Sequence, residues 1–245
     1  MPSYDAAFFD YVNTTARTAA ELIVPKLNAE LRPASVLDVG CGQGAWLAVW
    51  RTQGARDVFG VDGDYVDRKR LQVPENCFRA LDLGGGFDLQ RHFDFVQCLE
   101  VAEHVPAANS GRLLDSLVRH GRIILFSAAP PGQGGHDHVN EKSYEYWRRE
   151  FSRRQYRAVD FLRPQIRDDQ RIAAWYRYNP MLYVHPESLP QLSQALQASL
   201  IPEGTAVADL APLRYRIRKQ IVRRLPVSVM TSIARVKERV MGRKS

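Results

Sequence analysis

The sequence has no apolar run approaching the roughly 20 residues that a transmembrane helix needs. Its start, MPSYDAAFFD, lacks a basic segment ahead of an apolar run, which argues against a secretory signal. Only three cysteines are present, Cys41, Cys77 and Cys98, and none has a CxxC or Cys/His spacing typical of zinc. All three adjoin apolar, strand-like runs, so we expect buried, reduced thiols in a cytoplasmic protein.

Internal repeats and low-complexity tracts are also absent. Among the 245 residues, 45% are hydrophobic and 25% are charged, which excludes a disordered, collagen-like or coiled-coil chain. The length fits one large α/β domain with an appendage, or two small domains.

The charge is unevenly distributed along the chain. The net charge of the whole chain is +7, but residues 211–245 alone carry +10, so the first 210 residues carry −3. We therefore expect two parts with separate functions. Residues 1–210 should form a mildly acidic domain, and residues 211–245 should form a basic helical tail.

Strand-like and helix-like runs alternate through the first part, which predicts a parallel sheet covered by helices. We expect a doubly wound α/β fold, Rossmann-like, with a mostly parallel seven-stranded sheet whose late strands pair antiparallel at the edge. The expected strands are residues 35–39, 57–61, 77–81, 93–99, 121–126, 156–161 and 181–185. The expected helices are residues 6–31, 45–53, 110–119, 143–152 and 187–200, with a polar connection over 162–179.

A glycine-rich loop, VLDVGCGQG, follows the first buried strand and precedes a helix. Gly40, Gly42 and Gly44 allow a tight turn and a close approach of a ligand to the backbone. Asp62 ends the second strand, where a carboxylate can accept both hydroxyl hydrogens of a ribose. A tight turn without a ligand is the alternative, but the strand–loop–helix context favours a nucleotide-type cofactor.

The loop reads GxGxG, so it does not meet the GxGxxG dinucleotide fingerprint. Asp38 stands at the strand tip ahead of the first glycine, where its charge would repel a pyrophosphate but suit an ammonium group. This favours S-adenosylmethionine, which has an amino-acid end, over NAD.

Four motifs in order resemble those of class I S-adenosylmethionine-dependent methyltransferases: VLDVGCGQG, VDGD, LDL and FDFVQCLEVAEHV. The resemblance is close over about residues 33–126 and loose over the late strands, and it does not cover the tail. It implies that the three loop glycines line the methionine part of the cofactor and that Asp62 holds the ribose. It further implies that Asp82 and Leu83 border the adenine, and that the strand ending at Leu99 lies under the sulfonium.

By the same resemblance, the N-terminal segment 1–32 would be a helical lid over the cofactor. Packing on the sheet edge explains that segment equally well. Its aromatic residues are Tyr4, Phe8, Phe9 and Tyr11.

Glu100, Glu103 and His104 form an ExxEH group where the fourth strand ends. On a helical turn these positions share one face, and two carboxylates with an imidazole suit Mg²⁺ or Mn²⁺. The EVxEHV pattern is similar to ubiquinone-pathway O-methyltransferases and to small-RNA 3′-terminal 2′-O-methyltransferases. The RNA branch implies a metal held by these three residues and a histidine from a later loop, here His136 or His138. A metal-free role of His104 as base or substrate contact, or a purely structural role, remains open.

The loop SAAPPGQGGHDHVNE follows the fifth strand, at the same sheet edge as the glycine loop. Its polar residues suit the wall of a site better than a core, although a solvated turn is the alternative. Similar loops occur in methyltransferases associated with bacterial surface-polysaccharide and secondary-metabolite synthesis. An aromatic set nearby could stack on a sugar or aryl acceptor, but we favour packing over the sheet; it comprises Tyr144, Tyr146, Trp147, Trp175, Tyr176 and Tyr178.

In the tail, Leu213, Ile217 and Ile221 recur every four residues among basic side chains, and a second apolar stripe follows Pro226. Two short basic amphipathic helices favour peripheral contact with an anionic membrane, on its inner face. Nucleic acid is the rival, but Tyr215 is the only aromatic residue of the tail, so base stacking is poorly served. An arm packed on its own domain or on a second subunit is the third interpretation.

Taken together, these patterns predict an S-adenosylmethionine-dependent methyltransferase that O-methylates a sugar, a glycan or another small hydroxyl acceptor. Two alternatives are kept: an RNA 2′-O-methyltransferase, and a non-catalytic cofactor-binding assembly protein at the membrane. The sequence does not specify the acceptor, the methylated atom, the metal or the oligomeric state.

Overall fold

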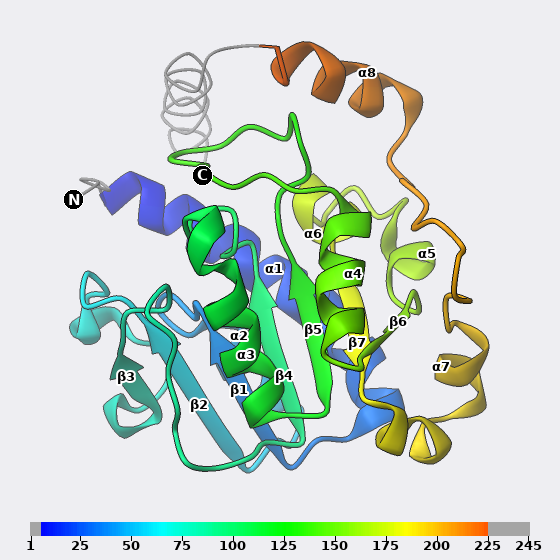
Figure 1. Cartoon of the computed structure of the whole chain (residues 1–245). Coiled ribbons are helices and arrows are strands. Elements are labelled where there is room, and N and C mark those ends of the chain that lie inside the picture. The colour runs from blue at the N-terminus through cyan, green and yellow to red at the C-terminus, as the bar shows by residue number, and fades with distance from the viewer. Residues whose placement is uncertain (1–5, 225–245) are drawn as a thin grey trace.

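The computed structural model describes residues 6–224, with side chains from residue 13 onward. Within that range the chain forms a seven-stranded sheet with the order β3-β2-β1-β4-β5-β7-β6 (Figure 1). β7 runs antiparallel to both of its neighbours, and the other strand pairs are parallel. The strands are β1 (Ser35–Val39), β2 (Asp57–Asp62), β3 (Phe78–Ala80), β4 (Phe95–Leu99), β5 (Ile123–Ser127), β6 (Arg157–Val159) and β7 (Met181–Val184). The predicted fold class is therefore confirmed.

Helices cover both faces of the sheet and create two apolar cores. The core on one face includes residues of α1 and α2, and the core on the other includes residues of α3 and α4 (Figure 1). The helices are α1 (Ala6–Leu31), α2 (Ala45–Thr52), α3 (Ser110–His120), α4 (Tyr144–Arg153), α5 (Arg163–Ile166), α6 (Ala174–Tyr178), α7 (Gln194–Ala198) and α8 (Leu213–Val222). Strands buried on both sides explain why β1, β4 and β7 read as nearly continuous apolar runs.

The order of the strands determines where a ligand binds. The chain leaves β1 toward β2 on one side, whereas β4 lies on the other side of β1. Ligands of open α/β sheets bind at such a switch point, outside the carboxyl ends of the strands. The glycine loop follows β1 and the EVAEHV segment follows β4, so both segments lie at this switch point.

Three local predictions were wrong. The segment 187–200 is not one helix: a 3₁₀ helix (Pro186–Gln191) ends at extended Leu192, and Ser193 then caps α7 through a hydrogen bond from the Leu196 amide. The connection 162–179 contains the short helices α5 and α6. Cys77 is only half-buried, because it precedes the short edge strand β3; Cys41 and Cys98 are buried free thiols as expected.

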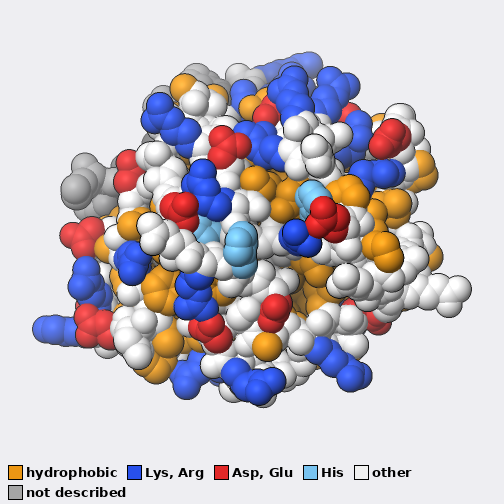
Figure 2. Space-filling model, turned by 60° about the horizontal axis from the view of Figure 1, so that its bottom comes forward, with side chains coloured by type: hydrophobic (Ala, Val, Ile, Leu, Met, Phe, Trp, Pro, Cys, Tyr) orange, Lys and Arg blue, Asp and Glu red, His pale blue; other side chains and the backbone are white. Residues whose placement is uncertain are grey.

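Two observations bear on a possible contact with membranes or nucleic acid. On the face shown in Figure 2, Lys and Arg side chains are interspersed with Asp and Glu, so neither sign of charge dominates there. No helix within residues 6–224 combines the length and apolar character that crossing a bilayer requires.

Candidate active site

The glycine loop turns sharply between β1 and α2. Gly40, Gly42 and Gly44 all adopt left-handed backbone angles. At Gly40, with a φ of 81°, a Cβ would lie 2.1 Å from Cγ2 of Val101 in the segment after β4. A side chain there would therefore push apart the two segments that meet at the switch point.

Asp62 lies at the end of β2 and is only 4% exposed. Its Oδ2 accepts a hydrogen bond from the Gly42 amide at 2.6 Å, which ties the carboxylate to the glycine loop. Its Oδ1 accepts from the Gly63 amide at 2.6 Å and from the Tyr65 hydroxyl. Burial raises the pKa of Asp62, and these hydrogen bonds oppose that rise. The carboxylate is thus fixed at the position predicted for a ribose ligand.

Asp38, at the tip of β1, is also buried. Burial raises its pKa to about 7, the neighbouring Gln97 side-chain amide lowers it, and the nearby charge of Asp62 raises it further. Its Oδ2 has no hydrogen-bond partner within the described residues. A buried, unsatisfied carboxyl oxygen beside the pocket suits the ammonium group of an amino acid.

The remaining predicted cofactor residues line the same cavity. Asp82 is exposed and accepts a hydrogen bond from the Gly84 amide at 3.0 Å, while Leu83 and Leu99 are buried. The wall opposite comes partly from α1, whose Asn13 side chain donates to Gln43 at 2.7 Å. Helix α1 thus borders the cavity and also packs in the core of the sheet, so its role as a lid stays a prediction. Tyr4 and the side chains of Phe8, Phe9 and Tyr11 lie outside the described residues.

Glu100 braces the loop that follows β5. Its backbone turns at the end of β4 with a positive φ of 56°, which is uncommon for a residue other than glycine. Its carboxylate accepts hydrogen bonds from the side-chain amides of Gln133 at 2.8 Å and Asn179 at 3.0 Å. Asn179 also donates to Gln133 at 2.8 Å, so the three side chains form a closed network. Burial raises the pKa of Glu100, and the hydrogen bonds oppose that rise.

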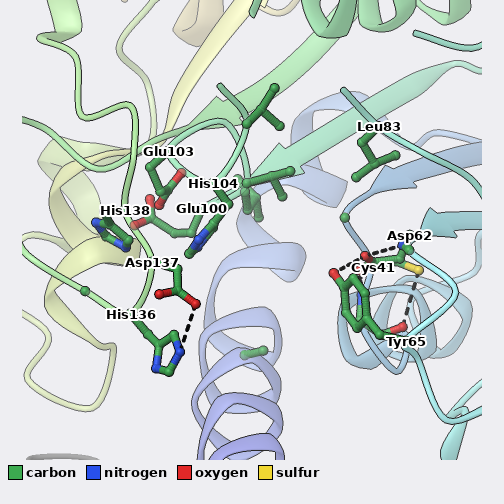
Figure 3. A pocket seen from close by; sticks show the side chains of 18 of the residues that line it. Cys41, Asp62, Tyr65, Leu83, Glu100, Glu103, His104, His136, Asp137 and His138 are labelled. Carbon is green, nitrogen blue, oxygen red and sulfur yellow. Dashed lines mark hydrogen bonds and ion pairs between the residues drawn. The ribbon is translucent and has the colours of Figure 1, made fainter. Parts of the chain in front are cut away.

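Glu103 and His104 come together with His138 from the later loop (Figure 3). One ligand atom from each of these three residues lies within 4.8 Å of the others. Glu103 is 1% exposed, and among the described residues neither of its carboxyl oxygens has a hydrogen-bond partner of ordinary geometry. Burial and the adjacent Glu100 carboxylate raise the pKa of Glu103 well above its usual range. Glu100 was predicted as a further metal ligand but lies outside this group.

His104 is neutral at pH 7. Desolvation in the pocket and the adjacent His138 lower its pKa to about 4, although part of the ring remains open to the cavity. The segment 101–104 forms a turn closed by the His104 amide donating to the Val101 carbonyl at 2.9 Å, in place of the helical turn expected there. His104 lines the cavity, and its neutral ring carries one nitrogen lone pair.

Glu141 orients His138. The Nδ1 atom of His138 lies 2.9 Å from Oε1 of Glu141, and the amides of Gly132 and Gly134 donate to the same carboxylate at 2.7 and 2.8 Å. Burial raises the pKa of Glu141, but these hydrogen bonds outweigh it and leave the pKa lowered. The ionised Glu141 carboxylate contacts the Nδ1 edge of the His138 ring, so Nε2 is the ring atom left for a ligand.

His136, the other candidate from the loop, points elsewhere (Figure 3). Its Nε2 lies 3.0 Å from Oδ2 of Asp137, and it lines the cavity without joining Glu103, His104 and His138. The loop is attached to the end of β4, because the amides of Val139 and Asn140 both donate to the Glu103 carbonyl, at 2.9 and 3.0 Å.

Helix α8 packs on the outside of this loop (Figure 1). The Arg218 guanidinium donates to the Gln133 carbonyl at 3.1 Å, and Gly132 lies so close that a Cβ would meet the Lys219 carbonyl oxygen at 1.9 Å. The Lys219 ammonium is buried and donates to Asp209 at 2.6 Å. Of the tail, residues 225–245, including the second predicted stripe, lie outside the described residues.

Most of the predicted site residues border one cavity of about 1370 Å³, whereas Gly44, Glu141 and Asn179 lie behind its wall. Ligand pockets usually measure about 300–1,000 Å³, so this one has room for a cofactor and an acceptor together. The cofactor side is lined by the glycine loop and by Asp38, Asp62 and Asp82, and the other side by Glu103, His104 and the loop histidines. Half of the aromatic set is buried, namely Trp147, Tyr176 and Tyr178, and Trp175 and Tyr176 line the cavity.

Sequence reasoning missed three residues of the site: Asn179, Glu141 in its orienting role, and Arg218. Asn179 lies 79 residues from its partner Glu100, and no local pattern links the two. For Glu141 the sequence does contain a signal: a carboxylate three residues after His138 could have been recognised as a partner of that histidine.

Comparison with known proteins identifies the family. A family model described as "Methyltransferase domain" matches residues 11–168. A ubiquinone biosynthesis O-methyltransferase of Neisseria meningitidis serogroup C is 35% identical over 112 residues, which are 41% of this chain and 46% of the relative. The chain spans about half the length of the first curated relatives that it matches.

Two solved structures show the same fold. The sugar N-methyltransferase of Streptoalloteichus sp. ATCC 53650 is 16% identical with a TM-score of 0.52, covering 69% of this chain and 87% of that one. A small-RNA methyltransferase is 16% identical with a TM-score of 0.50, covering 68% of this chain and 25% of that one. The chain belongs to the methyltransferase-domain family, with the class I fold that binds S-adenosylmethionine.

Proposed function

We propose that this protein transfers the methyl group of S-adenosylmethionine to a hydroxyl group of a sugar or another small acceptor. The observation that carries the proposal is the single cavity in which Asp38 and Asp62 lie on one side and His104 and His138 on the other. A cofactor held on the first side would present its methyl group to an acceptor held on the second.

The chemistry is an in-line displacement. A lone pair of the acceptor oxygen forms the new C–O bond as the bond between carbon and sulfur breaks, which yields a methyl ether and S-adenosylhomocysteine. The carbon is already activated by the sulfonium, so positioning supplies much of the rate. The hydroxyl proton must still leave, and the neutral His104 is the group in the cavity that accepts it.

The residues around His104 also fit a divalent metal ion. A buried carboxyl group and two imidazoles, from Glu103, His104 and His138, offer ligand atoms within 4.8 Å of one another. This mixed oxygen and nitrogen set suits Mn²⁺ better than Mg²⁺. A bound ion would acidify an acceptor hydroxyl, and Glu141 would hold His138 in the ligating tautomer.

Two facts support a hydroxyl acceptor of modest size. Relatives that match this chain are named for O-methylation in ubiquinone biosynthesis, which favours a hydroxyl. One structure with this fold is named a sugar N-methyltransferase, which favours a sugar as acceptor but not the oxygen as the methylated atom. The cavity also combines carboxylates and imidazoles with the pocket-lining aromatic residues Trp175 and Tyr176. Polar groups beside an aromatic wall are a usual means of binding sugars and aryl alcohols. Synthesis of a bacterial polysaccharide is one setting for such a reaction.

RNA as the acceptor is the second candidate. The basic helix α8 beside the cavity favours it, because phosphates bind such surfaces. Against it, the ring of Tyr215 lies 5.6 Å from that of Tyr178, so it packs inward and does not offer a face for a base.

The test uses methyl-labelled S-adenosylmethionine with fractionated bacterial extract, with and without EDTA. We expect label in a glycan or small-molecule fraction, lost in His104→Ala and retained in His92→Ala, which changes an exposed histidine outside the cavity. Loss of label with EDTA would support the metal, and EDTA-resistant label would leave His104 as the base. Label in RNA would replace the proposed acceptor, and wild-type turnover by His104→Ala would exclude His104 from the mechanism.

A further inference from the structure

Helix α8 turns its apolar residues away from its own domain. Leu213, Ile217 and Ile221 are 68%, 51% and 61% exposed, and they are three of the five large hydrophobic residues exposed among those the structure describes. They recur every four residues, so they form one continuous ridge along the helix. An apolar ridge that a protein leaves in contact with water marks a surface that binds something else.

The opposite side of α8 attaches it to the domain by polar means. Lys219 donates to Asp209, Arg218 donates to the Gln133 carbonyl, and Tyr215 packs against Tyr178. Burying a lysine while three aliphatic side chains stay exposed is the reverse of the usual arrangement of a surface helix. The anchoring contacts therefore fix the direction in which the apolar ridge points.

Arginines border the ridge on both sides. At 100° per residue, Arg214 lies on one flank of the ridge and Arg216 and Arg223 on the other, and all three are exposed. The stretch 211–224 contains no Asp or Glu. Apolar side chains flanked by exposed arginines match the interface of an anionic bilayer, where the chains enter the acyl region and the guanidinium groups meet lipid phosphates.

We propose that α8 is a docking helix for an anionic lipid surface. Charge decides against two other occupants. A second copy of α8 would bring two sets of arginines together without a carboxylate between them, and the chain after residue 224 is itself net positive. Anionic lipid complements both the ridge and its flanks.

Docking would also place the cavity beside the lipid. Arg218 and Val222 of α8 line the cavity, and so does the exposed Val139 of the adjoining loop. An amphiphilic acceptor would reach His104 from the bilayer without crossing water. The docking itself does not depend on the proposed methyl transfer.

The test is co-sedimentation of the full chain with vesicles of phosphatidylglycerol and phosphatidylcholine, compared with pure phosphatidylcholine. We expect binding to the anionic vesicles that falls with added salt. Replacing the ridge in Leu213→Gln/Ile217→Gln/Ile221→Gln should weaken binding at least about tenfold. Arg214→Gln/Arg216→Gln should weaken it as well, whereas Arg51→Gln/Arg56→Gln, two exposed arginines of the domain, should bind as the wild type does.

Circular dichroism and the affinity for S-adenosylmethionine verify that each variant is folded. Absence of wild-type binding to anionic vesicles would overturn the proposal, and so would wild-type binding by the ridge variant, since another part of the chain would then carry the contact. A dimer that becomes a monomer in the ridge variant, without lipid binding by either, would assign the ridge to a second copy instead.

Discussion

The rings of His104 and His138 meet edge to face, with centroids 5.0 Å apart, although they come from segments 34 residues apart in the chain. Each histidine is placed by a different part of the fold. His104 follows the turn after β4, while His138 is oriented by Glu141 within a loop fixed to the Glu103 carbonyl. This arrangement makes Glu141 a positioning residue.

Glu141→Gln should lower turnover by about 10- to 100-fold, because His138 loses the charge that favours its Nδ1 proton. Cofactor affinity should be unchanged, since Glu141 does not line the cofactor side of the cavity. Steady-state kinetics and calorimetry measure the two quantities separately. Glu187→Gln, at an exposed ion pair with Arg122, is the matched control. Unaltered turnover in Glu141→Gln would remove its role in orienting His138.

Cofactor affinity should depend on pH through Asp38. The ammonium group of S-adenosylmethionine favours the ionised carboxyl, whereas burial raises the pKa of Asp38 to about 7 in the free protein. Affinity should therefore be highest above pH 7 and weaken by up to about tenfold per unit as the pH falls below it. Calorimetry between pH 5.5 and 8.5, chosen as roughly 1.5 units either side of that pKa, tests this. Asp38→Asn should bind weakly at every pH, and an unchanged pH dependence in this variant would assign the titration to another group.

Asp62 and Tyr65 should have opposite effects on cofactor binding. Asp62→Ala removes the carboxylate proposed to accept hydrogen bonds from the ribose hydroxyls, so it should greatly weaken cofactor binding. Tyr65→Phe removes a hydroxyl that donates to the oxygen a ribose would need, so binding should become tighter. Calorimetric titration of both variants tests the pair. Weaker binding by Tyr65→Phe would mean that the tyrosine contacts the cofactor and does not compete with it.

The fold was predictable because its signals are local. The strands β1, β2 and β4 are mostly apolar runs of five or six residues that end at a glycine or a carboxylate, and Asp38 and Asp62 lie at the ends of two of them. The error at 187–200 has the same origin: the apolar spacing suits a helix, but extended Leu192 and the Ser193 cap divide it into two pieces.

The acceptor side of the site was less predictable because its contacts are long-range. Glu100 and Glu103 are both glutamates of the ExxEH group, and the sequence does not distinguish them. In the structure Glu100 accepts hydrogen bonds from Gln133 and Asn179, whereas Glu103 faces the histidines. Sequence spacing placed both carboxylates at the end of β4, but the packing of the later loop and α6 separates their roles. Helix α8 is a second example. The period of its apolar residues is visible in the sequence, but the direction in which they face depends on the contact between Lys219 and Asp209.

Gly132→Ala should release α8 from the loop. The residue has a φ of 86°, and an added Cβ would lie 1.9 Å from the Lys219 carbonyl oxygen, a backbone atom that cannot turn aside. Gly204→Ala is a matched control, because Gly204 has a φ of 79° but nothing within 4 Å of its Cβ position. Both variants carry the backbone strain of about 1–2 kcal/mol, so any further effect of Gly132→Ala measures the packing of α8.

We expect trypsin to cleave Gly132→Ala faster at the arginines of α8, and turnover to fall because the loop that holds His138 loses its outer support. Mass spectrometry of the fragments locates the cleavage, and Gly204→Ala should be digested at the wild-type rate in this region. If the two variants show equal protease sensitivity in α8, the polar and aromatic contacts of the helix hold it, and the close approach at Gly132 does not secure it.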